Sequence, residues 1–374
     1  MVMKGALNIL AEASIPYLRG NLEKMGIVRY LPSAGFTPEA VRNADWLIIR
    51  SITKITPSLL EGSRVKLITT ATIGFDHIDT DYCATHGITW RNAPGCNAGG
   101  VGQYFGSYVS LLALRGEIKP EEMTLGIVGA GHTGQEVTKY ARALGMRVLW
   151  NDPPRAEREG SGEFVSLDTL AREADLIEYH VPYTRSGAHP THHLLTEEFV
   201  GKLERKPLVA NLCRGAVTDS AALLRGVDEG RISRLVMDCW EGEPRISKEL
   251  LAKAEIATPH IAGFSAEGKR RGALVCVRHG AEFFGTEMPE IEQPPAPVAP
   301  VIDLSAVSGR NSLYHALLHT FDPRRPDRLL RAHADDFERL RREYDYPREA
   351  PAYTVIGADG DYAPLLAGLG FVVK

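Results

Sequence analysis

The glycine-rich segment Gly129-Ala130-Gly131-His132-Thr133-Gly134 constrains the fold of this chain more than any other feature of its sequence. It follows a short apolar run, Leu125–Val128, that predicts a buried strand, and it leads into a stretch ending at Leu144 with a helical pattern. Glycines at this spacing suit a tight turn, a close approach of backbone to a phosphate, and close packing of helix on strand. The segment therefore predicts a dinucleotide-binding loop in a parallel α/β sheet.

An acidic residue follows this loop where dinucleotide-binding folds place one. The next predicted strand, Arg147–Trp150, leads to Asn151 and Asp152. A carboxylate there accepts hydrogen bonds from ribose hydroxyls and repels a 2′-phosphate, so Asp152 favours NAD over NADP. The alternative is a glycine-rich turn that binds no cofactor. The residues expected to contact NAD from this pattern are Gly129, Gly131, His132, Thr133, Gly134 and Asp152.

Short apolar runs alternate with helix-capable segments over most of the chain, which predicts parallel sheets covered by helices. A Pro-rich stretch, 294–300, resembles a stiff linker, and the charged segment after it has the pattern of a small third domain. The expected class is α/β, with two Rossmann-like doubly wound domains and a small C-terminal α+β domain. The expected bounds are 1–103 completed by 269–288 for the first domain, 104–268 for the NAD-binding domain and 289–374 for the third.

Composition narrows the class of partner. The net charge of −4 gives no reason to expect nucleic acid, and the five cysteines form no CxxC pair that would suggest a zinc site or a disulfide framework. No apolar run approaches the ~20 residues that cross a bilayer, so we expect a cytoplasmic protein without a membrane partner. A zinc site at His189, His192 and His193, or nucleic acid at the basic run 324–342, is a weaker alternative to a loop beside the site and a solvated surface.

Three charged residues each follow a predicted strand in the second half of the NAD-binding domain: Arg214, Glu243 and His260. Because ligands of open α/β sheets bind beyond the carboxyl ends of the strands, all three are expected at one cleft. Histidine can accept a hydroxyl proton, a carboxylate can orient the imidazole, and an arginine can bind a substrate carboxylate. Taken singly, each also suits an ordinary role as a surface salt bridge, a solvated turn or a structural histidine.

These patterns resemble the D-2-hydroxyacid dehydrogenase family over residues 6–285. Further motifs resemble the branch that acts on a four-carbon phosphorylated hydroxy acid in vitamin B6 (pyridoxine) synthesis. The segments that carry the resemblance are Arg50–Lys54, Thr70–His77, Ala93–Ala98, Asn151–Arg155, Cys213–Val217, Trp240–Pro244, Pro259–Gly263 and Gly268-Lys269.

The resemblance implies NAD-dependent oxidation of 4-phospho-D-erythronate to (R)-3-hydroxy-2-oxo-4-phosphooxybutanoate. It implies a homodimer formed through the C-terminal domain, with His260 transferring the proton and Arg214 and Glu243 also catalytic. Further residues that it places near NAD are Val181, Cys213, Asp238 and Gly263. Residues that it places near the substrate are Ser51, Thr72, Gly74 and Phe264. Arg50 or Lys54 is a candidate for the cation that binds the phosphate.

Two other functions stay open at this stage. One is a different D-2-hydroxyacid dehydrogenase, of the phosphoglycerate or glyoxylate type. The other is a non-catalytic, NAD-sensing protein of the corepressor kind, because this fold also serves that role. The two enzyme classes differ in substrate, and the sensor differs from both in needing no imidazole at position 260 for its function.

Overall fold

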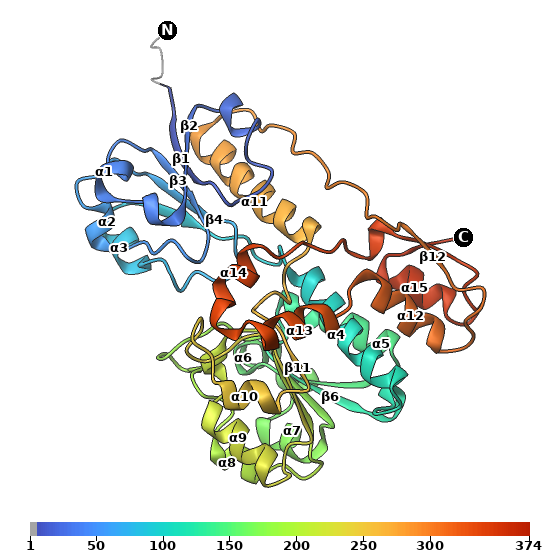
Figure 1. Cartoon of the computed structure of the whole chain (residues 1–374). Helices are drawn as coiled ribbons and strands as arrows, with labels where there is room; N and C mark the ends of the chain where they lie inside the picture. The colour runs from blue at the N-terminus through green and yellow to red at the C-terminus, as the bar shows by residue number, and fades with distance from the viewer. Residues whose placement is uncertain (1–5) are drawn as a thin grey trace. The chain divides into compact units, whose positions relative to one another are not determined.

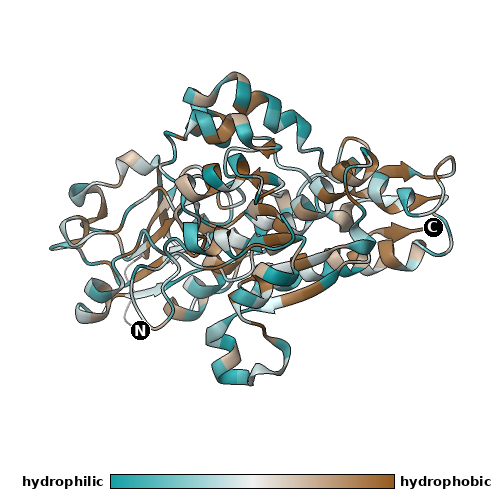
Figure 2. Cartoon of the chain, turned by 90° about the horizontal axis from the view of Figure 1, so that it is seen from below, coloured by the Kyte–Doolittle hydropathy of each residue, from teal (hydrophilic) through white to brown (hydrophobic). Residues whose placement is uncertain are grey.

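The computed structural model describes residues 6–374, whose contacts divide them into two compact units (Figure 1). The first unit is formed by the chain up to Asn97 together with Ser265–Pro295, and the second by Ala98–Phe264 together with Ala296–Lys374. Within the described residues, no helix has the length and apolar character needed to cross a membrane. The sheets supply much of the apolar interior: Figure 2 shows mostly brown strands and helices of mixed colour.

The first unit contains a five-stranded parallel sheet with the order β2-β1-β3-β4-β5, a doubly wound arrangement. The strands expected at 47–49 and 67–70 are present as β3 and β4, buried on both faces. The strands of this unit are β1 Asn8–Glu12, β2 Ile27–Leu31, β3 Trp46–Ile49, β4 Leu67–Thr70 and β5 Thr89–Arg91, and its helices are α1 Pro38–Val41, α2 Pro57–Leu60, α3 Thr80–Thr85 and α11 Ala266–Phe284.

Helix α11 returns to this sheet from a distant part of the chain and lies beside its strands in Figure 1. The sequence predicts the helix from residue 269, and it begins three residues earlier because the Ser265 side chain caps it by accepting the N–H of Gly268 at 3.0 Å. Gly280 lies over the buried Trp46, and a Cβ at this glycine would come within 2.1 Å of the indole. The missing side chain therefore sets how closely helix and sheet approach.

The second unit contains a six-stranded parallel sheet with the order β11-β10-β9-β8-β6-β7. A parallel bridge between Trp150 and Phe164 continues it beyond β7, which completes the strand order of a Rossmann fold. The winding reverses between β6 and β8, where such sheets bind ligands. The strands are β6 Thr124–Val128, β7 Arg147–Asn151, β8 Leu176–Tyr179, β9 Leu208–Asn211, β10 Arg234–Met237 and β11 Ile256–Ala257, and the helices are α4 Ala98–Leu114, α5 His132–Ala143, α6 Pro153–Glu159, α7 Leu167–Glu173, α8 Glu197–Gly201, α9 Ser220–Asp228 and α10 Lys248–Lys253.

The C-terminal segment adds a three-stranded sheet to this unit, in the order β12-β13-β14. The sequence predicts a small α+β domain here; strands and helices are present, and the strands pair in parallel because helices connect them. Its contacts place the segment in the same compact unit as the six-stranded sheet, so the division into three domains stays a prediction. The elements are β12 Val301–Asp303, α12 Asn311–Thr320, α13 Arg324–Ala332, α14 Phe337–Arg342, β13 Thr354–Ile356, α15 Ala363–Leu369 and β14 Val372–Val373.

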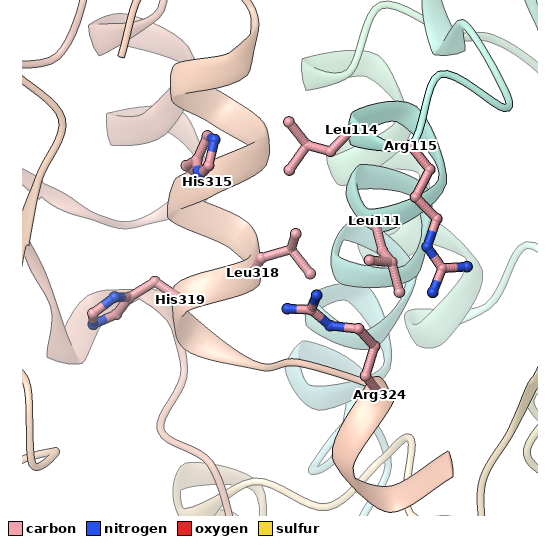
Figure 3. Close-up of a pocket in the computed structure, with 7 residues that line it drawn as sticks. All are labelled: Leu111, Leu114, Arg115, His315, Leu318, His319 and Arg324. Atoms are coloured by element: carbon pink, nitrogen blue, oxygen red, sulfur yellow. The ribbon is translucent and has the colours of Figure 1, made fainter. Parts of the chain in front are cut away.

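Helix α12 packs against α4, so the C-terminal segment shares a core with the NAD-binding sheet. Figure 3 shows Leu318 of α12 pointing toward Leu111 and Leu114 of α4. A pocket of about 460 Å³ lies there, and Arg115 and Arg324 are among the residues that line it. The Ser107 hydroxyl of α4 also donates to the Leu317 carbonyl at 3.2 Å, in a buried position.

We expect Gly280→Ala to destabilise the protein by about 1–3 kcal/mol, because the added methyl group would overlap the rigid indole of Trp46. Thermal unfolding followed by circular dichroism measures this as a lower midpoint. Gly368→Ala in α15 is the control, since a Cβ there meets nothing within 4 Å. A midpoint unchanged by Gly280→Ala would contradict the close approach of α11 to β3.

Candidate active site

His260 and Glu243 form a hydrogen-bonded pair beyond the carboxyl ends of β10 and β11. The Nδ1 atom of His260 lies 2.6 Å from Oε1 of Glu243, and the side chains are 19% and 25% exposed. The other carboxylate oxygen of Glu243 accepts the N–H of Trp240 at 3.3 Å. The pair is therefore fixed in orientation on one side and partly open to a ligand, as the sequence pattern predicts.

The loop that carries His260 is wrapped around the buried carboxylate of Asp238. One oxygen accepts the Thr258 hydroxyl at 2.6 Å and the Ile261 N–H at 2.7 Å, and the other accepts the Ala262 N–H at 2.9 Å. His260 itself has φ of +56° and donates its N–H to the Asp238 carbonyl at 2.8 Å. A non-glycine residue keeps such a backbone only when its surroundings determine it, and Asp238 provides that constraint.

Arg214 follows β9 and lies on a turn that packs directly against the Glu243 loop. Its carbonyl accepts the buried side-chain N–H of Asn211 at 3.0 Å. A Cβ at Gly215 would come within 2.0 Å of the Trp240 carbonyl carbon. The absence of a side chain at Gly215 thus lets the turn of Arg214 contact the loop of Glu243, so the structure brings these two predicted residues into adjoining segments.

The glycine loop fits the demands of a bound dinucleotide. Gly129 has φ of +97°, and a Cβ there would meet the His180 backbone at 2.8 Å. A Cβ at Gly134 would lie 2.2 Å from the Gly129 carbonyl oxygen, whereas one at Gly131 would meet nothing within 4 Å. Gly131 thus leaves open space at the start of α5, where His132 and Thr133 begin the helix without a side-chain cap. Such a helix N-terminus suits a pyrophosphate.

Asp152 lies directly after β7 and shapes this loop. Its two oxygens accept one backbone N–H each, from Ala130 at 3.0 Å and Arg155 at 3.1 Å. The side chain is half-buried, so its remaining lone pairs can accept from ribose hydroxyls. Arg155 is ion-paired with Glu159 at 2.6 Å and donates to the Ala130 carbonyl, so it is already occupied as a partner for a 2′-phosphate.

The other residues predicted near NAD lie in the same unit and differ in how far their side chains are buried. The Val181 side chain borders the glycine turn, because a Cβ at Gly129 would lie 2.8 Å from its Cγ1. Cys213 is buried, and its N–H donates a hydrogen bond to the side-chain oxygen of Asn211. The carboxylate of Asp238 points toward the His260 loop, where it accepts the Thr258 hydroxyl. The backbone of Gly263 lies against Gly100 of α4. Contacts of all four with the cofactor stay predictions.

In the first unit, the hydroxyl of Thr72 donates to the Gly74 carbonyl at 2.8 Å and accepts from Thr70, whose Oγ1 lies 2.7 Å away. Ser51 lies on the turn after β3 and is half-buried. The sequence reasoning missed the residue that fixes this turn, Glu12. Its buried carboxylate accepts the Arg50 N–H at 3.0 Å and the Thr53 hydroxyl at 2.7 Å. An acid ending the first apolar run was the available signal.

Of the three neighbouring histidines His189, His192 and His193, two form hydrogen bonds to different carboxylates. His189 bonds to Glu157 at 2.8 Å, and His193 bonds to Glu241 at 2.7 Å while its ring stacks on His192. Among residues 6–374, no group of three or more metal-ligating side chains is found. Glu241 precedes the Glu243 position by two residues, so His193 borders the loop of the candidate site.

The charge state of Glu243 follows from its neighbours. Burial by itself raises the pKa of this carboxyl, but the imidazole of His260 and then the guanidinium of Arg341 outweigh burial and hold it below the ordinary value of 4.5. Glu243 is thus a carboxylate at neutral pH. Burial also raises the pKa of Asp238, against the opposing effects of His260 and the three hydrogen bonds from the loop.

We expect Glu243→Gln to lower the unfolding midpoint at neutral pH and to have a smaller effect in acid. A group whose folded-state pKa is depressed contributes stability above its unfolded-state pKa, and that contribution is lost as the pH falls through the folded-state value. The difference between the two proteins should therefore shrink below about pH 4.5. Thermal melts at a series of pH values measure it, and a difference that grows in acid would contradict the assignment.

Comparisons with known proteins agree with this geometry. Residues 112–262 match the family model of the D-isomer specific 2-hydroxyacid dehydrogenase, NAD binding domain. An erythronate-4-phosphate dehydrogenase of Porphyromonas gingivalis is 49% identical over 98% of this chain and 100% of its own length. One of Escherichia coli is 38% identical over 98% of both chains.

Solved structures show the same fold. The D-lactate dehydrogenase of Aquifex aeolicus, complexed with NAD and lactic acid, has a TM-score of 0.61 at 25% identity and covers 74% of this chain and 96% of its own. The NAD-bound 3-phosphoglycerate dehydrogenase of Entamoeba histolytica has a TM-score of 0.64 at 23% identity, over 77% of this chain and 100% of its own. With full-length relatives well above 30% identity, the chain belongs to the erythronate-4-phosphate dehydrogenases, a branch of the D-isomer specific 2-hydroxyacid dehydrogenase family.

Proposed function

We propose that the protein oxidises 4-phospho-D-erythronate to (R)-3-hydroxy-2-oxo-4-phosphooxybutanoate with NAD, as a step of pyridoxine biosynthesis. The observation that carries the proposal is the 2.6 Å pair of His260 and Glu243, a base oriented by a carboxylate. The names of the full-length relatives supply the substrate. The NAD-binding family model and the fitted glycine loop supply the cofactor.

His260 is the base for the substrate hydroxyl. Because Glu243 is a carboxylate and only accepts, Nδ1 carries the proton of the 2.6 Å hydrogen bond, which leaves the lone pair of Nε2 for the hydroxyl proton. The imidazolium that forms is stabilised by the negative charge of Glu243. The reverse reaction returns the same proton from Nε2 to the carbonyl oxygen.

Arg214 binds the substrate carboxylate and polarises the carbonyl that develops at the neighbouring carbon. The hydride that leaves this carbon is accepted by the nicotinamide of NAD when the cofactor is bound. One proton on His260 and one hydride on the cofactor account for both hydrogens removed from the alcohol.

The binding roles of the other residues are part of the proposal. The glycine loop, with His132 and Thr133, binds the pyrophosphate of NAD, and the Asp152 carboxylate accepts hydrogen bonds from the ribose hydroxyls. On the family resemblance, Val181, Cys213, Asp238 and Gly263 are assigned to NAD, and Ser51, Thr72, Gly74 and Phe264 to the substrate.

We also infer a cytoplasmic homodimer formed through residues 289–374. The C-terminal sheet supports this, because its two edge strands each expose a large apolar residue, Val301 at 51% and Val372 at 47%. An edge strand offers unpaired backbone N–H and C=O groups that can pair with another chain.

A substrate panel tests the function. We expect NADH formation with 4-phospho-D-erythronate, and less or none with 3-phosphoglycerate or glycolate. A parallel assay with a 2-oxo acid as hydride acceptor follows the oxidised product instead of NADH, because the acceptor reoxidises bound NADH and so removes the unfavourable equilibrium of α-hydroxy acid oxidation by NAD. Turnover of phosphoglycerate without turnover of the erythronate would overturn the assignment and leave the family intact.

His260→Ala should lower kcat by about 10²–10⁴-fold, because the variant has no group to accept the hydroxyl proton. NADH binding, measured by fluorescence, should stay within about twofold of the parent protein. His86→Ala is the matched control, since His86 is exposed and lies in the first unit. Oxidation at the parent rate in the His260 variant would rule out this mechanism and favour a sensor.

Asp152→Ser should weaken NADH binding by about tenfold, through loss of charge-assisted hydrogen bonds to the ribose. The same change should bring NADPH affinity closer to that for NADH, because the repulsion of a 2′-phosphate disappears. Fluorescence titration with both nucleotides measures the ratio. Asp168→Ser is the control, since this exposed carboxylate pairs with Lys202 on the protein surface. An equal loss in both variants would argue against a ribose contact.

A further inference from the structure

The C-terminal segment reaches the candidate active site of its own unit. Nε of Arg341 lies 3.3 Å from the His260 carbonyl oxygen, and its guanidinium carbon lies 5.6 Å from the centre of the Phe264 ring. The rings of Tyr344 and Tyr346 pack against the same phenylalanine, with centroids 6.4 and 5.9 Å away. Segment 341–346 thus surrounds the side chain that follows the His260 loop.

Arg341 differs from the other arginines of α14 in its charge balance. Arg339 pairs with Asp336 at 2.6 Å, and Arg342 pairs with Glu343 at 3.2 Å. Among residues 6–374, no carboxylate lies within 4.0 Å of the Arg341 nitrogens, and its one hydrogen bond is to the His260 carbonyl. The positive charge of Arg341 helps to lower the pKa of Glu243, although the two side chains do not form an ion pair.

This arrangement leaves a half-buried guanidinium in need of an anion. Removing a charged group from water is unfavourable unless it gains a partner, and a neutral carbonyl offers only partial compensation. The terminal N–H groups of arginine form a planar fork that matches phosphate and carboxylate oxygens. Among residues 6–374 no carboxylate pairs with it directly, and Glu243 interacts with it only at longer range, so a directly bound anion is expected from a ligand.

We propose that Arg341 binds the phosphate group of the substrate. The inference rests on the proposed function, which gives the substrate two anionic groups and assigns its carboxylate to Arg214. Arg341 adjoins both the proton-transferring His260 and Phe264, which the resemblance places near substrate. Arg341 is thus a further candidate for the cation that binds the phosphate, beside Arg50 and Lys54 of the first unit.

The test compares 4-phospho-D-erythronate with D-erythronate in Arg341→Met, Arg341→Lys and the parent protein. Loss of a charge-assisted hydrogen bond predicts a KM for the phosphorylated substrate about 10- to 100-fold higher in Arg341→Met, with a much smaller loss of kcat/KM on D-erythronate, which has no phosphate for Arg341 to bind. Arg341→Lys should recover part of the loss. Arg342→Met is the matched control on the same helix and should leave the kinetics with both substrates unchanged, since Arg342 is exposed and pairs with the neighbouring Glu343.

Equal losses on both substrates would overturn the proposal, because they would show that Arg341 only supports the His260 loop. Failure of the parent protein to oxidise 4-phospho-D-erythronate would count against the proposed function and is seen without any variant. Calorimetry with inorganic phosphate then decides the role of Arg341 independently of turnover. Phosphate binding by the parent and not by Arg341→Met supports the anion site, and equal or no binding in both overturns it.

Discussion

The buried carboxylate of Asp238 is the interaction on which the reactive part of this structure depends. It accepts three hydrogen bonds from the segment between Thr258 and Ala262, and that segment is thereby closed around a single charge. The Thr258 hydroxyl donates to Asp238 and so accepts from Tyr104 of α4, at 2.7 Å. One chain of hydrogen bonds therefore joins helix α4, the loop that carries His260 and the end of strand β10.

The sequence predicts much of this site because parallel sheets place their strand ends together. Arg214, Glu243 and His260 could be named from their positions after apolar runs, and Asp152 from its distance to the glycine loop. The residues that fix those side chains could not be named in the same way. Gly215 and Glu12 act through contacts with segments remote in the chain, Trp240 and Arg50, and a sequence alone does not show which remote segments meet.

In the fold, too, elements with a local sequence pattern are predictable, whereas contacts between distant residues are not. Strands buried on both faces, such as β3 and β4, read as continuous apolar runs and were predicted at almost their observed bounds. The pairing of Phe164 with Trp150 was not predicted, because a single bridging residue leaves no periodic pattern. The approach of Arg341 to His260 escaped prediction for a related reason, since 81 residues separate them and the segment appears only as a charged helix.

The contact of Gly215 with the Trp240 backbone has a consequence for how such enzymes can diverge. Two turns from different strands share a space that admits no side chain, so neither can change its path without the other. Grafting a loop from a related dehydrogenase onto this scaffold would then need both turns to be exchanged as one block. New substrate preferences should arise more readily in segments outside that block, where insertions leave the shared backbone contact intact.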